Sequence, residues 1–156
     1  MDHVGDRDRT MAVGPADGWT VAPATGRAPL AIRAAGVAHI ALGLGFGVGA
    51  VIALDHYARV GELPMTPWGF RALAGGPFEA LAPDTFRVLG WTLVGVCAID
   101  VLAGIWLWQG RRRGAALGLA TNPVALTLGA GFALPFLLAG VPIRAALVLA
   151  GRGAIR

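Results

Sequence analysis

The most restrictive feature of this sequence is an apolar run at residues 88–108 that contains a single charged residue, Asp100. A helix rises about 1.5 Å per residue, so a run of this length can cross the ~30 Å hydrocarbon core of a bilayer. A lone aspartate at the centre of such a helix costs ~2.5–3.5 kcal/mol on insertion scales. Asp100 therefore predicts both a membrane-spanning helix and a polar partner inside the protein.

The composition is that of an integral membrane protein. Of the 156 residues, 56% are hydrophobic and only 14% are charged, which is unusual for a soluble domain. The net charge is +4, but the arginines are scattered at the ends of apolar segments and form no basic face, which argues against nucleic-acid binding. The single cysteine, Cys97, excludes a disulfide or a CxxC redox pair within one chain.

The apolar pattern predicts an all-α, polytopic bundle of four transmembrane helices, at about residues 29–54, 86–109, 114–130 and 134–151. They form a single membrane domain over residues 29–152, preceded by a disordered cytoplasmic tail over residues 1–28, which is rich in charges, glycine and proline. The last two helices would both be short. Three spans followed by an interfacial C-terminal helix therefore form the alternative.

The connecting segment at residues 55–85 is too polar to span and is expected outside the cytoplasm. A Thr-Pro pair at 66–67 and a Gly pair at 75–76 predict a short surface helix over residues 68–74, and Pro77 is a second helix-start signal. Asp84 is expected to cap the second spanning helix.

The arginines predict the orientation of the chain, because cytoplasmic loops of membrane proteins carry an excess of basic residues. With four spans, most of them fall on one side if both termini lie in the cytoplasm. We therefore expect a bacterial inner-membrane protein with its N-terminus and its C-terminus inside. The inner set is Arg27, Arg33, Arg111, Arg112, Arg113, Arg152 and Arg156, and the outer set is Arg59, Arg71 and Arg87.

A glycine-rich run at residues 43–49 contains overlapping GxxxG spacings. Such spacings expose the backbone on one helix face and let a second helix approach closely. A phosphate-binding loop would need a preceding strand, which the sequence does not contain. The run therefore predicts close helix packing.

The polar residues within the predicted spans fall at one depth. Counted from the cytoplasmic end of each helix, His39 lies ~15 Å deep, Asp100 ~14 Å, and Asn122 and Arg144 ~12 Å. We predict that Asp100 meets Arg144 or His39 inside the bundle and that Asn122 completes the hydrogen bonding. Such a layer can be an ion pair that fixes helix register, or it can be a proton relay or ligand pocket.

Common cofactor and catalytic motifs are missing from the sequence. A b-type haem would need a second axial ligand at the depth of His39, but His3 lies in the tail and His56 lies beyond the outer end of the same helix. There is no HExxH motif and no Ser/His/Asp or Cys/His arrangement at a common position. We therefore expect no metal, and we do not expect the chain to be an enzyme on its own.

Residues 98–120, from Ala98 through Asp100 and an arginine turn to an alanine-rich helix, resemble the DoxX-like four-helix membrane proteins. Asp100 stands where that family usually has glutamate, and Ala103-Gly104 stands at its pair of small residues. The resemblance implies a four-helix bundle. Some members of the family act as membrane subunits of sulfur- or thiol-linked, quinone-coupled oxidoreductase systems.

Three functions are open at this point. The first is an accessory or anchoring subunit, possible also in a redox-linked form, that docks a protein partner through Trp68, Phe70 and Phe78. We favour this function because so thin a polar layer leaves little room for a pore. The second is an oligomeric small-solute or proton-coupled transporter protomer that uses the Asp100 layer. The third is a quinone-reactive oxidoreductase subunit in which His39 and Asp100 handle protons; a quinone is the one cofactor considered.

Overall fold

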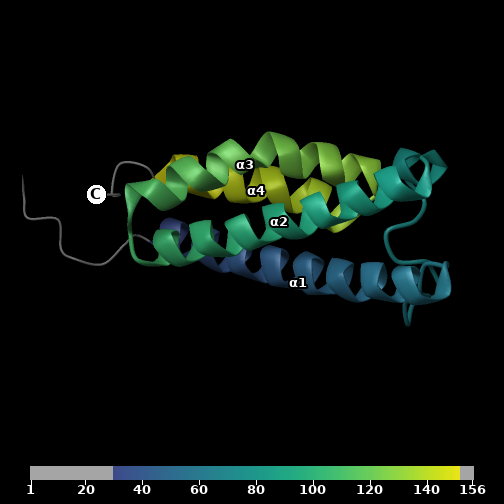
Figure 1. The fold of residues 1–156 in the computed structure, drawn as a ribbon. Helices are drawn as coiled ribbons and strands as arrows, with labels where there is room; N and C mark the ends of the chain where they lie inside the picture. Colours follow the sequence, from purple (N-terminus) through teal and green to yellow (C-terminus); the bar gives the residue numbers. More distant parts are fainter. Residues whose placement is uncertain (1–29, 152–156) are drawn as a thin grey trace, which may run out of the picture.

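The computed structural model describes residues 30–151, which form an all-helical bundle (Figure 1). The predicted tail at 1–28 lies outside the described residues. Four long helices follow one another: α1 (Leu30–Val60), α2 (Pro83–Trp108), α3 (Arg112–Gly131) and α4 (Pro135–Gly151). A short 3-10 helix, η1 (Pro77–Ala80), lies in the connection between α1 and α2. The predicted all-α fold is confirmed.

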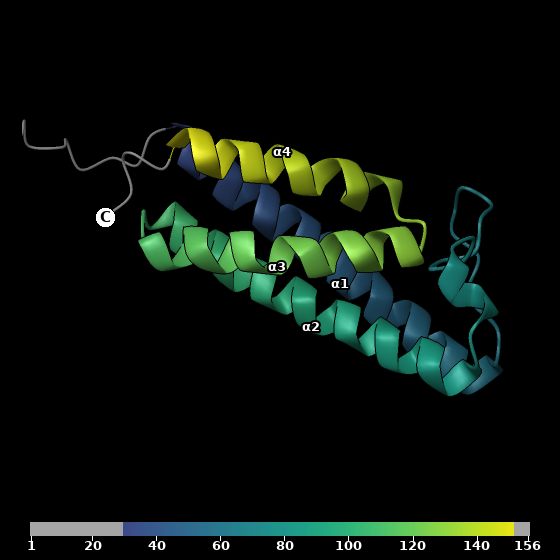
Figure 2. The ribbon, with the colours of Figure 1, turned by 90° about the horizontal axis from the view of Figure 1, so that it is seen from above.

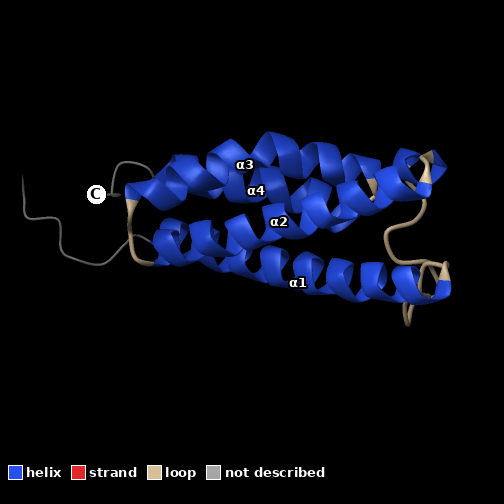
Figure 3. Cartoon of the chain, in the orientation of Figure 1, coloured by secondary structure: helices blue, strands red, loops and turns tan. Residues whose placement is uncertain are grey.

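The helices run up and down and pack in the cyclic order α1, α2, α3, α4, with α4 returning to α1 (Figures 1 and 2). By length and composition, α1 and α2 are long and apolar enough to cross a membrane, and α4 is a shorter apolar helix of 17 residues. With 31 and 26 residues, α1 and α2 extend beyond the ends of α3 and α4, which have 20 and 17 residues. The α1–α2 connection lies at the end of the bundle where α1 and α2 extend beyond the other two helices (Figure 3).

Two helix ends differ from the prediction. Helix α1 continues past residue 54 to Val60, where Asp55 and Arg59 pair one turn apart on its surface and support the extra turns. Helix α2 begins at Pro83, so Ala82 is the capping residue, and Asp84 makes no capping hydrogen bond. The prediction of Asp84 as the cap was wrong because proline itself is well suited to the first helical position.

The predicted surface helix over residues 68–74 is also wrong. Residues 64–72 instead form a tight hairpin, which we call the aromatic hairpin. The backbone N–H and the hydroxyl of Thr66 both donate to the carbonyl of Phe70, each at 2.8 Å, and Gly69 adopts a left-handed conformation (φ 85°). The Thr-Pro pair therefore begins a turn and not a helix. The threonine side chain closes this turn, and the glycine allows the chain to reverse direction.

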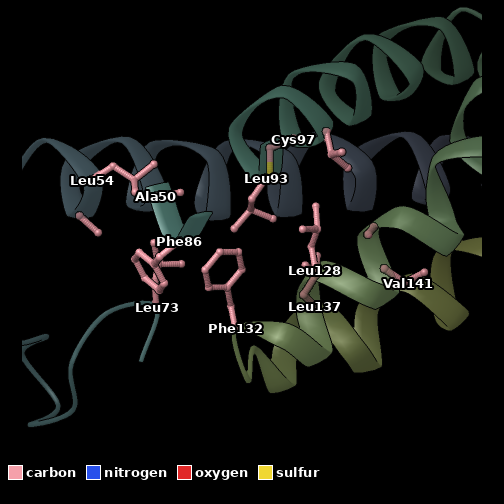
Figure 4. Packing of buried hydrophobic residues seen from close by; sticks show 13 residues of the cluster. Ala50, Leu54, Leu73, Phe86, Leu93, Cys97, Leu128, Phe132, Leu137 and Val141 are labelled. Atoms are coloured by element: carbon pink, nitrogen blue, oxygen red, sulfur yellow. The ribbon is translucent and has the colours of Figure 1, made fainter. Parts of the chain in front are cut away.

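The core consists of two apolar clusters. The larger one lies toward the α1–α2 connection and includes Leu54, Leu93, Phe132 and Leu137 (Figure 4). The smaller one lies toward the opposite end and consists of Ile32, Ala35, Leu107 and Val148 with their neighbours. Along each helix, the buried polar residues fall between the two clusters.

The glycine run packs as predicted on one face only. A Cβ atom built on Gly43 would lie 2.7 Å from the carbonyl oxygen of Cys97, and one on Gly47 would lie 3.0 Å from the Cys97 Cβ, so α1 and α2 are in close contact there. A Cβ built on Gly45 or Gly49 meets nothing within 4 Å. The second GxxxG spacing therefore faces open space rather than a helix.

Candidate functional site

A buried polar layer crosses the bundle at mid-height. Each long helix contributes to it: His39 from α1, Asp100 from α2, Asn122 from α3 and Arg144 from α4. Exposed fractions are 1% for His39 and Asp100, 8% for Asn122 and 0% for Arg144. The structure thus brings together all four residues that the depth argument placed at one level.

The centre of the layer is an ion pair between Asp100 and Arg144. Nη1 of Arg144 lies 2.6 Å from Oδ2 of Asp100, so the predicted contact is present. The second carboxylate oxygen, Oδ1, accepts a hydrogen bond of 3.0 Å from the hydroxyl of Thr121. A charge-assisted bond and a hydroxyl therefore satisfy both oxygens of a carboxylate that has no access to water.

Asn122 orients the arginine. Its side-chain oxygen Oδ1 accepts a hydrogen bond of 3.1 Å from Nε of Arg144. Since Nη1 is bound to Asp100, two of the three guanidinium nitrogens have partners on two different helices. The third, Nη2, is buried and has no hydrogen-bond partner within residues 30–151. Arg144 thus ties α4 to α2 and to α3.

His39 lies beside the ion pair but is not hydrogen-bonded to it. Its Nδ1 is 3.5 Å from Oδ1 of Asp100, beyond the usual length of a hydrogen bond, and neither ring nitrogen has a partner among the described residues. A Cβ atom built on Gly118 of α3 would lie 2.7 Å from Cε1 of His39. The imidazole therefore occupies space that exists because residue 118 has no side chain.

Replacing Gly118 with alanine is expected to lower the free energy of unfolding by about 1–3 kcal/mol, because the added methyl group must displace the buried imidazole. The measurement is a double-mutant cycle of Gly118→Ala and His39→Ala, followed by denaturant unfolding in detergent. If the two sites are in contact, the cost of Gly118→Ala should shrink when residue 39 is alanine. An unchanged cost in the His39→Ala background would contradict the contact.

The layer has the properties of an internal clamp. Its one acid and one arginine balance, it is enclosed by apolar clusters at both ends, and its members come from all four helices. Within residues 30–151, no group of three or more His, Cys, Asp and Glu side chains is placed to hold a metal ion. The observed geometry holds the helices in register and leaves both ring nitrogens of His39 without a hydrogen-bond partner among the described residues.

Two members of the layer, Thr121 and Gly118, were missed by the sequence analysis. The signal for them was their spacing, because residues 118, 121 and 122 lie on one face of a helix. Neither residue type has a large free-energy cost in a membrane helix, so neither predicts a buried partner in the way that a charged residue does. The Thr121 hydroxyl proton is shared between Oδ1 of Asp100, at 3.0 Å, and the carbonyl of Gly118, at 3.1 Å.

The three aromatic residues predicted to contact a partner are not equivalent. Trp68 and Phe70 of the aromatic hairpin are 80% and 59% exposed and stack on each other with ring centroids 6.3 Å apart. Phe78 of η1 instead packs edge-on against Phe132, at 5.1 Å between centroids. Phe78 is thus only partly exposed, and its role as a contact residue stays a prediction.

Comparisons with protein-family models, with curated proteins and with solved structures find no match for this chain.

Proposed function

We propose that this chain is a four-span protein of the bacterial inner membrane that anchors or assists a protein partner. The distribution of polar and apolar side chains supports the membrane location, because it is the opposite of that in a soluble protein. The charged pair is buried, whereas large apolar side chains are exposed on every helix, where a lipid environment would cover them. Examples, one from each of α1 to α4, are Val48, Leu102, Val124 and Ile143.

Charge and aromatic placement support an orientation with both ends of the described bundle inside. Arg33 at the start of α1 lies over the ring of Trp108 at the end of α2, 5.5 Å from its centroid. Three arginines, at residues 111–113, follow directly at the same end. An interfacial tryptophan next to a cluster of arginines is typical of the cytoplasmic boundary. The aromatic hairpin then lies on the outer side.

The closed polar layer supports an anchoring role over conduction. Asp100 and Arg144 are bound to each other and are at most 1% exposed, so the single bundle offers an ion no hydrated path through the layer. We therefore assign the Asp100–Arg144 pair, together with Asn122, to holding α2, α3 and α4 together. This agrees with the resemblance to DoxX-like proteins, in which subunit roles occur.

The aromatic hairpin is the observation that carries the proposed partner contact. It is fixed by several backbone hydrogen bonds, including Ala72 N–H to the Pro64 carbonyl at 2.9 Å, and it still exposes Trp68 and Phe70. A rigid segment that presents large aromatic side chains loses little conformational entropy on binding. Tryptophan is also among the residues that most often dominate protein interfaces.

A photoreactive phenylalanine analogue at position 68 is expected to capture one polypeptide in native membranes. The control places the same analogue at Trp91, a half-exposed tryptophan on α2 that faces away from the bundle core. A discrete cross-linked product from position 68 alone would support the anchoring function. Capture of lipid only, together with a stable homo-oligomer in detergent, would contradict it and favour the transporter protomer.

A further inference from the structure

A large apolar cavity lies beneath the aromatic hairpin. Its volume is about 720 Å³, within the roughly 300–1,000 Å³ typical of small-molecule sites. It is bounded by α1, by the hairpin and the chain up to Ala74, and by the turn between α3 and α4. Representative lining residues from these three parts are Gly45, Gly49, Trp68, Phe70, Phe132 and Phe136.

The bare glycine face of α1 forms one wall of this cavity. Gly43 and Gly47 are explained by the contact with α2, but Gly45 and Gly49 touch nothing within 4 Å of a built Cβ. Large apolar residues of the same helix, Leu44 and Val48, are exposed nearby. The two glycines therefore leave a depression in a helix surface that otherwise carries large apolar side chains. Contacts between the described helices do not explain why glycine stands at these two positions.

Strained backbone shapes the opposite wall. Within residues 30–151, only two residues other than glycine have a positive φ, Leu73 at 61° and Ala133 at 51°, and both line the cavity. Such conformations cost of order 1 kcal/mol or more for a residue with a side chain and concentrate at binding sites. The residue directly after the aromatic hairpin and the α3–α4 turn thus both adopt unusual backbone conformations at this cavity.

Among the described residues that line the cavity, Thr66, Arg71 and the indole N–H of Trp68 supply the polar side-chain groups. The hydroxyl of Thr66 donates to the carbonyl of Phe70, so it is already used. The guanidinium of Arg71 is exposed and has no ion pair among the described residues, although it also borders a smaller hollow of about 200 Å³ together with Glu62 and Glu79. The occupant must therefore be apolar inside and can carry a negative group at the position of Arg71.

We propose that this cavity binds the acyl chain of an anionic phospholipid, with the lipid phosphate next to Arg71. The inference rests on the membrane placement of the proposed function, which puts the exposed apolar face of α1 in contact with lipid. An acyl chain can enter from the bilayer without crossing water, and it needs no hydrogen bond inside the cavity. Arg71 then favours an anionic over a zwitterionic headgroup by charge complementarity.

The test is native mass spectrometry of the full-length protein, delipidated in mild detergent and titrated with phosphatidylglycerol or phosphatidylcholine of identical chains. The wild-type protein should prefer phosphatidylglycerol. In Gly45→Leu/Gly49→Leu, binding should fall roughly tenfold, the effect of losing about two buried methylene groups from the complex. Gly95→Leu is the matched control, because a side chain on this exposed glycine of α2 also meets nothing within 4 Å.

Arg71→Gln provides a second variant that does not depend on filling the cavity. It should bring phosphatidylglycerol binding down to the level of phosphatidylcholine without loss of folded protein. Equal binding by the cavity-filling variant and by Gly95→Leu, or no headgroup preference in the wild type, would overturn the proposal. A protein that stays soluble and monomeric after detergent removal would instead contradict the membrane placement, and this result is distinct from any loss of lipid selectivity.

Discussion

Asp100→Ala is expected to lower the free energy of unfolding by about 3–5 kcal/mol, the usual cost of removing one partner of a buried ion pair. The physical reason is the arginine that remains. Arg144 is 0% exposed, and its Nη1 would lose its only carboxylate while staying enclosed by four helices. Circular dichroism of the purified protein during denaturant unfolding in detergent measures the loss directly.

Two controls show whether the effect belongs to the buried pair. Asp84→Ala removes an exposed carboxylate that lies 3.9 Å from Arg87, and it should change stability by less than about 1 kcal/mol. The double variant Asp100→Leu/Arg144→Met removes both charges and should recover most of the lost stability. A similar stability for Asp100→Ala and Asp84→Ala would refute the structural role of the pair.

Gly43→Leu is expected to have the second large effect. A Cβ at this position would lie 2.7 Å from the carbonyl oxygen of Cys97 and 2.8 Å from Cγ2 of Val101, so α1 and α2 would have to separate. Overpacking of this kind costs about 1–3 kcal/mol, and more where backbone must move. The measurement is the unfolding midpoint and the yield of folded protein.

The matched control for Gly43→Leu is two residues away in the same glycine run. Gly45→Leu introduces the same side chain on the same helix, but no atom lies within 4 Å of its built Cβ. Its unfolding midpoint should therefore equal or exceed that of the wild type, since leucine is the better helix former. Equal losses for both variants would indicate a general intolerance of the run and not a specific α1–α2 contact.

The bundle and the centre of its polar layer could be predicted because both follow from the free-energy cost of placing polar groups in an apolar environment, and this cost can be estimated from residue types alone. A long apolar run that crosses a bilayer has to be a helix, and charges such as those of Asp100 and Arg144 are costly inside an apolar bundle unless they are paired. The depth of each residue follows from helix rise alone. The residues around the pair could not be predicted in the same way. Thr121 carries little free-energy cost in any helix, and the space for His39 exists only because Gly118 has no side chain.

The connection between α1 and α2 could not be predicted because its structure depends on contacts with distant parts of the chain. Local signals at residues 66–76 indicated a helix, but the Thr66 hydroxyl and Gly69 favour a hairpin. Phe78 looked like an exposed loop aromatic and is held by Phe132, which lies far away in sequence. The cavity also escaped detection, because overlapping GxxxG spacings do not show which of their faces meets a helix.

The order in which the two charges are synthesised has a consequence for how this protein is made. Arg144 follows Asp100 by 44 residues, which at ~5–20 residues per second corresponds to roughly 2–9 s of translation. During that interval the carboxyl group has no arginine, whereas His39 has already been synthesised. The carboxylate oxygens of Asp100 can therefore meet the Thr121 hydroxyl and the Arg144 guanidinium only after α3 and α4 have followed α2 along the chain.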